Sequence, residues 1–192
     1  MRDKDVRAAV MRHLLILHCD DPSTRIVEEM GLWSGSVRVD VAVINGELSG
    51  IEIKSDRDTL DRLPLQERTY SRIFDQVTLV VGTKHVDRAY DMIPKWWGVT
   101  TARFVHDHVE LTPCRPAQRN PAPDPILVAG LLWKEEALSA LEERGLARGV
   151  RSKPVSAVHE RLATELPFHE LSACVRERLK RRSAWLGQAV SH

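Results

Sequence analysis

Two alternating segments around Asn45-Gly46 constrain the fold of this chain most strongly. Residues 37–44 (VRVDVAVI) place β-branched residues at alternate positions, and residues 48–54 (LSGIEIK) resume the alternation after the turn. Asn-Gly is a strong short-range signal for a β-hairpin, because both residues tolerate the positive φ angles that tight turns require. The sequence therefore predicts an antiparallel hairpin over residues 37–54.

The flanking segments predict helices and further strands. We expect a helix over residues 3–18, and a short helix that is capped by Ser23 or Thr24 and ends at Met30. The continuous apolar run at 77–82 is typical of a buried central strand. The buried positions expected in the first helix are Val6, Val10, Leu14 and Leu17. The other expected elements are a helix over 57–74, a helix over 85–93 and a hairpin within 99–111. This order predicts a layered α/β domain built on a small mixed sheet.

A proline-rich segment divides the chain. Residues 113–125 (PCRPAQRNPAPDP) contain five of the ten prolines, and proline fixes φ and removes a backbone donor. We therefore expect a linker over 113–125, between an α/β core over residues 1–112 and a helical unit over residues 126–192. Within the second unit the apolar spacing predicts helices over 131–146, 153–166 and 168–182.

Charge is concentrated in the second unit, although the whole chain has a net charge of only +1. Residues 1–112 hold 15 Lys and Arg against 18 Asp and Glu, whereas residues 144–182 hold 10 basic and 4 acidic residues. A basic stretch of this kind favours contact with nucleic-acid phosphates. The alternative is a solvated basic face on a helical bundle that packs on the core. The candidate phosphate-contacting residues are Arg144, Arg148, Arg151, Lys153 and Arg161.

Several function classes lack their sequence signals. The chain has no apolar run of 18 residues, so we expect no membrane span. The three cysteines are too few and too far apart for a disulfide framework or a zinc knuckle, which favours a reducing, cytoplasmic setting. The motifs GxxxxGK[ST], GxGxxG and GxSxG are absent, so ATP hydrolysis, dinucleotide chemistry and serine esterase chemistry have no support.

Three charged residues of the predicted hairpin form the most informative pattern. Glu52 and Lys54 are two positions apart on one strand and therefore share a face. Asp40 interrupts a run of valines on the other strand, and we expect Val39 and Val41 on the opposite face from it. Pairing of the two strands can bring the carboxylates together at one end of the sheet.

This set of side chains suits hydrolysis of a phosphodiester. Two carboxylates provide hard oxygen ligands for Mg²⁺ or Mn²⁺. An ammonium group beside them can orient a water molecule or stabilise negative charge that develops on a phosphoryl oxygen. An ExK pattern alone is weak evidence, because a cross-strand ion pair on any exposed strand gives the same pattern.

The spacing from Asp40 to Glu52-Ile53-Lys54 resembles the PD-(D/E)xK nuclease superfamily. Gln66 and Tyr70 in the following helix are similar to the Q-x₃-Y motif of its RecB-like exonuclease members, and they lie on one helix face. The surrounding sequence also resembles a group of small bacterial proteins of this superfamily. The resemblance covers about residues 20–97, and Val39 stands where many members have proline.

The resemblance implies a restriction-endonuclease-like core, a divalent metal ion (Mg²⁺ or Mn²⁺) and a nucleic-acid substrate, with DNA favoured. Asp40 and Glu52 would be metal ligands, and Lys54 would be the catalytic lysine. Gln66 and Tyr70 would position the substrate backbone or the active site. Many members add a glutamate from the helix before the aspartate strand. Of Glu28 and Glu29, the helical phase favours Glu29, which lies closer to the buried side.

A second resemblance concerns the basic unit. Residues 136–166 resemble the SAP-type helix–extended-loop–helix DNA-binding motif, and they show no base-reading pattern, so we expect nonspecific contact. Two further functions stay open at this stage. One is a catalytically silent nucleic-acid-binding or regulatory subunit that retains the nuclease fold, and the other is a structural α/β adaptor. A homodimer is compatible with the nuclease interpretation, since blunt cutting of a duplex needs one site for each strand.

Overall fold

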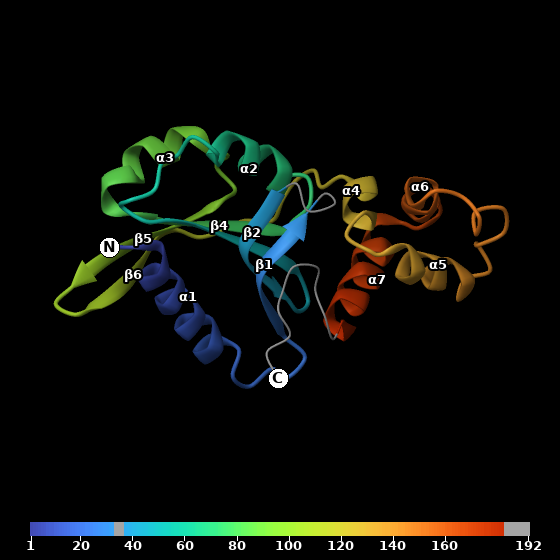
Figure 1. The fold of residues 1–192 in the computed structure, drawn as a ribbon, viewed down its shortest axis with the longest axis horizontal. Helices are drawn as coiled ribbons and strands as arrows, with labels where there is room; N and C mark the ends of the chain where they lie inside the picture. Colours follow the sequence, from blue (N-terminus) through green and yellow to red (C-terminus); the bar gives the residue numbers. More distant parts are fainter. Residues whose placement is uncertain (33–36, 183–192) are drawn as a thin grey trace.

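The fold is a mixed β-sheet flanked by helices, followed by a group of C-terminal helices (Figure 1). The structure is a computed structural model that describes residues 1–32 and 37–182. Six strands lie in the sheet in their chain order. They are β1 (Arg25–Leu32), β2 (Val37–Ile44), β3 (Leu48–Lys54), β4 (Gln76–Gly82), β5 (Gly98–Val105) and β6 (His108–Arg115). The mixed α/β class that the sequence predicts is confirmed.

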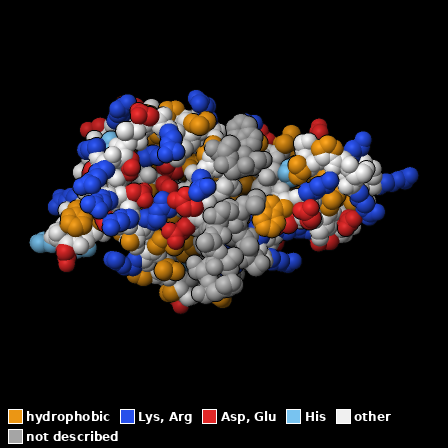
Figure 2. All heavy atoms as spheres, in the orientation of Figure 1, with side chains coloured by type: hydrophobic (Ala, Val, Ile, Leu, Met, Phe, Trp, Pro, Cys, Tyr) orange, Lys and Arg blue, Asp and Glu red, His pale blue; other side chains and the backbone are white. Residues whose placement is uncertain are grey.

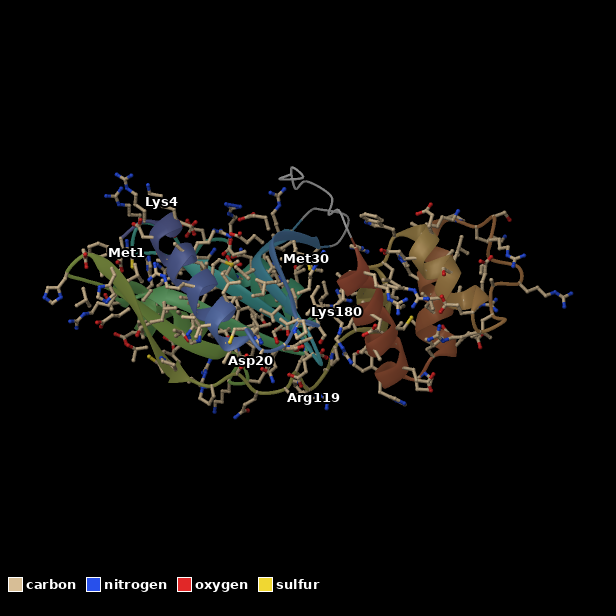
Figure 3. The ribbon with its side chains drawn as sticks, turned by 90° about the horizontal axis from the view of Figure 1, so that it is seen from below. Met1, Lys4, Asp20, Met30, Arg119 and Lys180 are labelled. Carbon is tan, nitrogen blue, oxygen red and sulfur yellow. The ribbon has the colours of Figure 1, made fainter. Side chains whose placement is uncertain are left out.

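Helices cover both faces of the sheet. On one face α1 packs on an apolar cluster that includes Val41, Ile51 and Val80 (Figure 3). The other face carries α2 and α3. The helices are α1 (Asp3–Leu17), α2 (Leu63–Tyr70), the 3₁₀ turn η2 (Thr83–His85), α3 (Val86–Met92), α4 (Pro125–Ala129), α5 (Lys134–Glu142), α6 (Val155–Glu165) and α7 (Phe168–Arg181). Among the described residues, none of these helices has the length and apolarity needed to cross a membrane.

The predicted hairpin is confirmed. Strands β2 and β3 pair antiparallel from Ile44 opposite Leu48 to Val41 opposite Ile51. Between them the Asn45 side-chain oxygen accepts a hydrogen bond from the Glu47 N–H. Strand β4 then pairs parallel with β3, and β5 pairs parallel with β4, so that α2 and α3 lie in the connections that parallel pairing requires. The buried strand expected at 77–82 is β4.

Two expectations for the N-terminal part are wrong. The segment expected to form a helix ending at Met30 is strand β1, because the hydroxyls of Ser23 and Thr24 both donate to the Asp21 carboxylate in a turn and do not cap a helix. Pairing with β2 then buries the apolar side chains of β1. Leu17 was expected in the core, but its side chain is 63% exposed, because the buried face of α1 ends at Leu14.

The helix expected over 57–74 is shorter. Helix α2 covers only Leu63–Tyr70, and Pro64 lies in its first turn. The residues directly after β3 form a turn instead, in which the Asp58 carboxylate accepts a hydrogen bond from the Ser55 N–H at 2.7 Å. This turn separates Lys54 from the start of α2, and it lets the helix return over the end of the sheet.

The proline-rich segment packs against the core. Strand β6 continues to Arg115, and Asn120 is buried. The Asn120 side-chain amide donates to the carbonyls of Ser71 and Phe74, each at 2.8 Å. The C-terminal helices add to the same apolar cluster as α2 and the sheet, through residues such as Val128 and Leu171.

Asn120 therefore attaches the proline-rich segment to the connection between α2 and β4. We predict that Asn120→Ala lowers the free energy of unfolding by about 2 kcal/mol, because the carbonyls of Ser71 and Phe74 lose their side-chain donor. Chemical denaturation followed by circular dichroism measures this difference. The matched control is Gln118→Ala in the same segment, whose exposed side chain should contribute less than about 0.5 kcal/mol. Equal effects of the two substitutions would contradict this account of the segment.

Candidate active site

The site forms where the regular pairing of the sheet is interrupted. Pairing of β2 with β3 ends at Val41 opposite Ile51, so Asp40 lies at the point where the two strands separate. On the other side of β2, Asp40 stands opposite Glu29 of β1, and this pair is not bridged although the pairs on both sides of it are. Glu29 has a φ of 54°, which is uncommon for a residue with a side chain.

At this interruption the odd-numbered valines of β2 switch from one face of the sheet to the other. Val39 packs in the cluster on the α2 side, whereas Val41 packs in the cluster under α1. The expectation that these two valines share one face is therefore wrong. The strict alternation on which it rests requires a regular strand, and the unbridged Glu29–Asp40 pair breaks that regularity.

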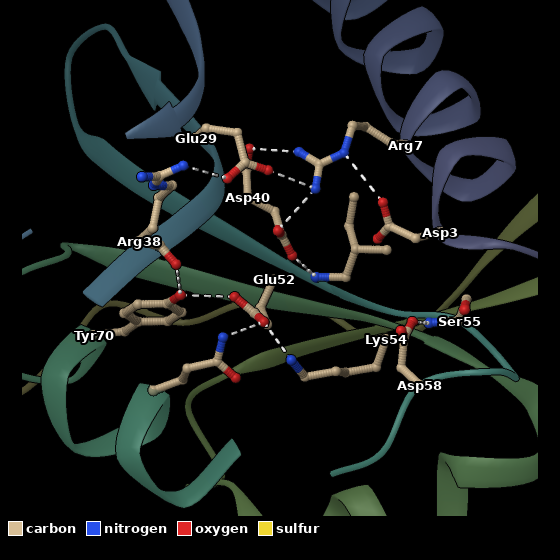
Figure 4. A network of polar contacts seen from close by, with 12 residues as sticks. Asp3, Arg7, Glu29, Arg38, Asp40, Glu52, Lys54, Ser55, Asp58 and Tyr70 are labelled. Atoms are coloured by element: carbon tan, nitrogen blue, oxygen red, sulfur yellow. Dashed lines mark hydrogen bonds and ion pairs between the residues drawn. The ribbon is translucent and has the colours of Figure 1, made fainter. Parts of the chain in front are cut away.

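The Asp40 carboxylate fills the gap between the separating strands. Its Oδ2 accepts a hydrogen bond from the Ile53 N–H at 2.7 Å, which satisfies a β3 donor beyond the last β2–β3 pair. Its Oδ1 accepts from Nη2 of Arg7 at 2.9 Å, and Nη1 of Arg7 donates to the Asp40 carbonyl at 3.0 Å. Asp40 is thus held by both the sheet and α1 (Figure 4).

Glu52 is the centre of a second group of contacts. Its side chain is only 1% exposed, and Lys54 Nζ lies 2.6 Å from its Oε1. Gln66 Nε2 donates to the same oxygen, and the Tyr70 hydroxyl lies 2.7 Å from Oε2. The same hydroxyl lies 2.8 Å from the Arg38 carbonyl, so Tyr70 joins β2 to β3 at the point where they separate (Figure 4).

Burial dominates the electrostatics of this group. Burial and, after it, the negative charge of Asp40 raise the pKa of Glu52 to about 7, although Lys54 and Tyr70 act in the opposite direction. Burial and the neighbouring Glu52 also raise the pKa of Tyr70, so Tyr70 is a neutral phenol that donates its proton in a hydrogen bond. Lys54 and Tyr70 therefore do not fully offset the cost of placing a negative charge on the buried Glu52 side chain.

Helix α2 fixes the two polar side chains that hold Glu52. Gln66 and Tyr70 are four residues apart and project from one face. The Tyr70 ring stacks on Trp97, with centroids 6.0 Å apart, and meets Phe74 edge-on at 5.6 Å. Gln66 Oε1 is buried and has no hydrogen-bond partner among the described residues, so one acceptor in the site is unused.

These residues share one pocket of about 510 Å³. Glu29 lines it, on strand β1 and not on the helix that was expected to carry it. Figure 2 shows acidic side chains on one face of the molecule with basic side chains around them. The charged residues that line the pocket are Asp3, Arg7, Glu29, Arg38, Asp40, Glu52, Lys54, Asp58 and Arg62. Each of the five residues that the motif indicates contributes to this pocket or directly contacts Glu52.

Few side chains of the site could serve as ligands of a metal ion. Over the described ranges 1–32 and 37–182, no three His, Cys, Asp or Glu side chains are grouped so that they could hold a metal ion by themselves. Asp40 and Glu52 nevertheless keep spare acceptor capacity, since a carboxylate offers about four lone-pair positions. The contacts described above use two of these positions on Asp40 and three on Glu52.

The five residues predicted to contact phosphates lie outside this pocket. They are in the loop between α5 and α6 or in α6 itself (Figure 1). Arg151 pairs with Glu142 at 2.9 Å, and Arg161 pairs with Glu165 at 3.6 Å. Arg144 lies 3.8 Å from Glu143. Arg148 and Lys153 are exposed and form no ion pair with another residue of the described part.

The chain matches the model of the family Bacteriophage P4 protein cII over residues 1–191. It belongs to this family. The cII protein of Enterobacteria phage P4 is 27% identical over 146 residues, which are 76% of this chain and 55% of the relative. This cII family member therefore spans about half the length of that curated relative. The solved structure of a protein of unknown function from Silicibacter pomeroyi is similar to this chain. The match covers 73% of this chain and 89% of that protein's chain, with 22% sequence identity and a TM-score of 0.41.

The sequence prediction missed Arg7 and Asp3, which reach the pocket from α1. Arg7 follows buried Val6 at the edge of the apolar face of the helix, where an arginine is ordinary. No spacing links it to the hairpin, because its contacts depend on how α1 packs across the sheet. Only the packed structure identifies it as a site residue.

The Tyr70 hydroxyl should stabilise the folded site. We predict that Tyr70→Phe lowers the free energy of unfolding by about 2 kcal/mol, because a buried carboxylate loses a donor. Tyr90→Phe is the matched control, since the hydroxyl of Tyr90 makes no hydrogen bond with a residue of the described ranges and its ring still packs under Arg115. Denaturant titration of both variants tests this, and a Tyr70→Phe variant as stable as the Tyr90→Phe variant would contradict it.

Proposed function

We propose that this cII family member is a divalent-metal-dependent nuclease of the PD-(D/E)xK type with a restriction-endonuclease-like core. It would hydrolyse phosphodiester bonds of nucleic acid, with DNA as the favoured substrate. One observation carries the proposal. Asp40, Glu52, Lys54 and Gln66 come from two strands and one helix and line a single pocket at an interruption of the sheet, and Tyr70 contacts Glu52 from the same helix.

The residues present fit a divalent cation. Asp40 and Glu52 together offer hard oxygen donors with unused lone pairs, and Mg²⁺ or Mn²⁺ prefers such ligands. A buried carboxylate whose pKa is raised to about 7 is poorly compensated, and a cation beside it would relieve this deficit. Gln66 also lines the pocket, and its Oε1 is an amide oxygen with no hydrogen-bond partner among the described residues. When bound, such an ion supplies positive charge to the phosphoryl oxygens.

The remaining residues have roles that their contacts support. Lys54 is buried and holds its ammonium 2.6 Å from Glu52, so it can orient a water molecule or stabilise negative charge on the phosphate. Gln66 and Tyr70 donate to the two oxygens of Glu52 and fix its orientation. Glu29 lines the same pocket and is a further candidate metal ligand.

The C-terminal helices supply a candidate surface for the substrate. Helix α5, an irregular stretch over residues 143–154 and helix α6 follow one another as in the SAP-type motif. Gly145 and Gly149 in that stretch have φ angles of 70° and 83°, which glycine adopts readily. Arg148 and Lys153 carry exposed charges that are not neutralised by ion pairs with described residues, so they are the strongest candidates for phosphate contact.

This surface also favours a second candidate function. The chain could bind nucleic acid through the basic loop without cutting it, as a silent or regulatory subunit. The observation that favours this alternative is that the basic residues lie outside the pocket, so that binding does not require a working metal site.

A cleavage assay separates the two functions. We expect purified protein to cut DNA in the presence of Mg²⁺ or Mn²⁺, and Asp40→Asn and Lys54→Ala each to lose about 100-fold or more of the rate. The substrates are linear and circular DNA, single- and double-stranded, together with RNA. Exposed Asp107 and Lys84 offer matched controls, since Asp107→Asn and Lys84→Ala change the same residue types outside the pocket.

The contradicting results are equally specific. Folded wild-type protein that binds DNA and cuts none of these substrates would favour the silent subunit. Cleavage that persists in both pocket variants would place the activity elsewhere or in a contaminant. Gel-shift measurements on the same samples distinguish lost binding from lost chemistry.

A further inference from the structure

We propose that the exposed side of helix α2 binds one strand of the nucleic-acid substrate beside the pocket. This inference rests on the proposed function and adds to it the path that the strand follows. We call this surface the α2 track and define it by Arg62, Leu65 and Arg68. Arg62 directly precedes the helix, and the other two residues lie within it. They would be substrate-binding residues that take no part in the chemistry.

The helical spacing leads the track from the pocket to the outside of α2. Arg62 has helical backbone angles and lies four residues before Gln66, so both side chains project on the side of the pocket that they line. Leu65 and Arg68 follow at intervals of three residues, and each interval turns the side chain by about 60° around the helix axis. At Arg68 the track has therefore turned away from the pocket.

Leu65 joins two hollows of the surface. Together with Arg62 it lines the pocket of about 510 Å³ that contains the candidate active site. Together with Arg68, and with Leu127 of α4, it also lines a second hollow of about 480 Å³. Figure 1 shows α2 on the side of the sheet that leads to the C-terminal helices. A strand with one phosphate in the pocket can therefore continue across Leu65 into the second hollow.

The two arginines of the track have charges that other residues do not neutralise. Both are exposed, and neither forms an ion pair or a side-chain hydrogen bond with a residue in the ranges 1–32 and 37–182. Arg72 also lines the second hollow, but its guanidinium is paired with Asp124 at 2.6 Å. Glu67 lines it as well, but its carboxylate accepts a hydrogen bond from the Ser71 hydroxyl. Exposed guanidinium groups of this kind bind phosphate oxygens through two parallel hydrogen bonds.

The dimensions of the track suit a single strand. Six helical residues separate Arg62 from Arg68, which is about 9 Å along the axis. A strand of a duplex advances about 3.4 Å per nucleotide, so this distance corresponds to between two and three nucleotides. Leu65 lies between the two arginines with 46% of its surface exposed, and it can pack against a sugar or a base. The track thus offers charge to phosphates and an apolar contact between them.

Binding in the absence of metal ions tests the track separately from cleavage. A fluorescently labelled single strand of DNA is titrated with the full-length chain in EDTA at several salt concentrations, and its anisotropy gives the Kd. We expect Arg62→Gln/Arg68→Gln to bind about tenfold more weakly or worse, because two charged hydrogen-bond donors are lost. The slope of log Kd against log salt should fall by about 1.4, since each phosphate contact with a single strand contributes about 0.7.

Two further measurements complete the test. The matched control is Arg88→Gln/Arg103→Gln, which removes two exposed arginines that line neither hollow and should keep the wild-type Kd and slope. In cleavage assays with Mg²⁺, the track variant should raise KM more than it lowers kcat, because the track binds substrate and does not contact the reacting phosphate. Circular dichroism checks that all variants are folded.

The outcomes separate this inference from the proposed function. An unchanged Kd and slope in the track variant, an equal loss in the control, or no binding of the strand by the wild type would overturn the track. Binding that depends on Arg148 and Lys153 alone would overturn it as well. Wild-type protein that binds the strand through the track but cuts no nucleic acid would instead overturn the proposed function, and the track would stand as the surface of a binding protein.

Discussion

The separation of β2 from β3 after Val41 is the feature on which the rest of the site depends. A regular ladder would pair the backbone there and leave no room for polar chemistry. Because the ladder stops, the Ile53 N–H needs another acceptor, and the Asp40 carboxylate provides it at 2.7 Å. The same separation is bridged by the Tyr70 hydroxyl, which reaches both the Arg38 carbonyl and Glu52. The carboxylates are thus part of the framework as well as candidates for its chemistry.

The electrostatic cost of the site is a consequence of this arrangement. Glu52 is buried close to Asp40, and both its burial and that neighbouring charge raise its pKa to about 7. Lys54, Gln66 and Tyr70 hold it with three hydrogen bonds but do not fully compensate it. A fold that needed only stability would gain from an apolar residue at this position. This cost is the reason for proposing that a cation binds beside Glu52.

The predictable parts of the fold are those set by local sequence. The alternation on both sides of Asn45-Gly46 predicts the hairpin, although neither turn residue adopts the positive φ angle expected of this pair, and the Glu52/Lys54 face follows from a period of two residues. Strand β1 was missed because its pairing with β2 overrides the local helical pattern of residues 23–30. The face change at Asp40 and the reach of Arg7 were also beyond sequence reasoning, since both arise from contacts between segments far apart in the chain.

The central claim is that Asp40 and Glu52 hold a divalent ion for phosphodiester hydrolysis. The most direct measurement is anomalous diffraction at the manganese edge from crystals of the protein grown with Mn²⁺. Our account predicts an anomalous peak in contact with carboxylate oxygens of both Asp40 and Glu52, and the loss of that peak in Asp40→Asn. Crystals of folded protein with no peak in this pocket at saturating Mn²⁺, or with a peak held by other residues alone, would contradict it.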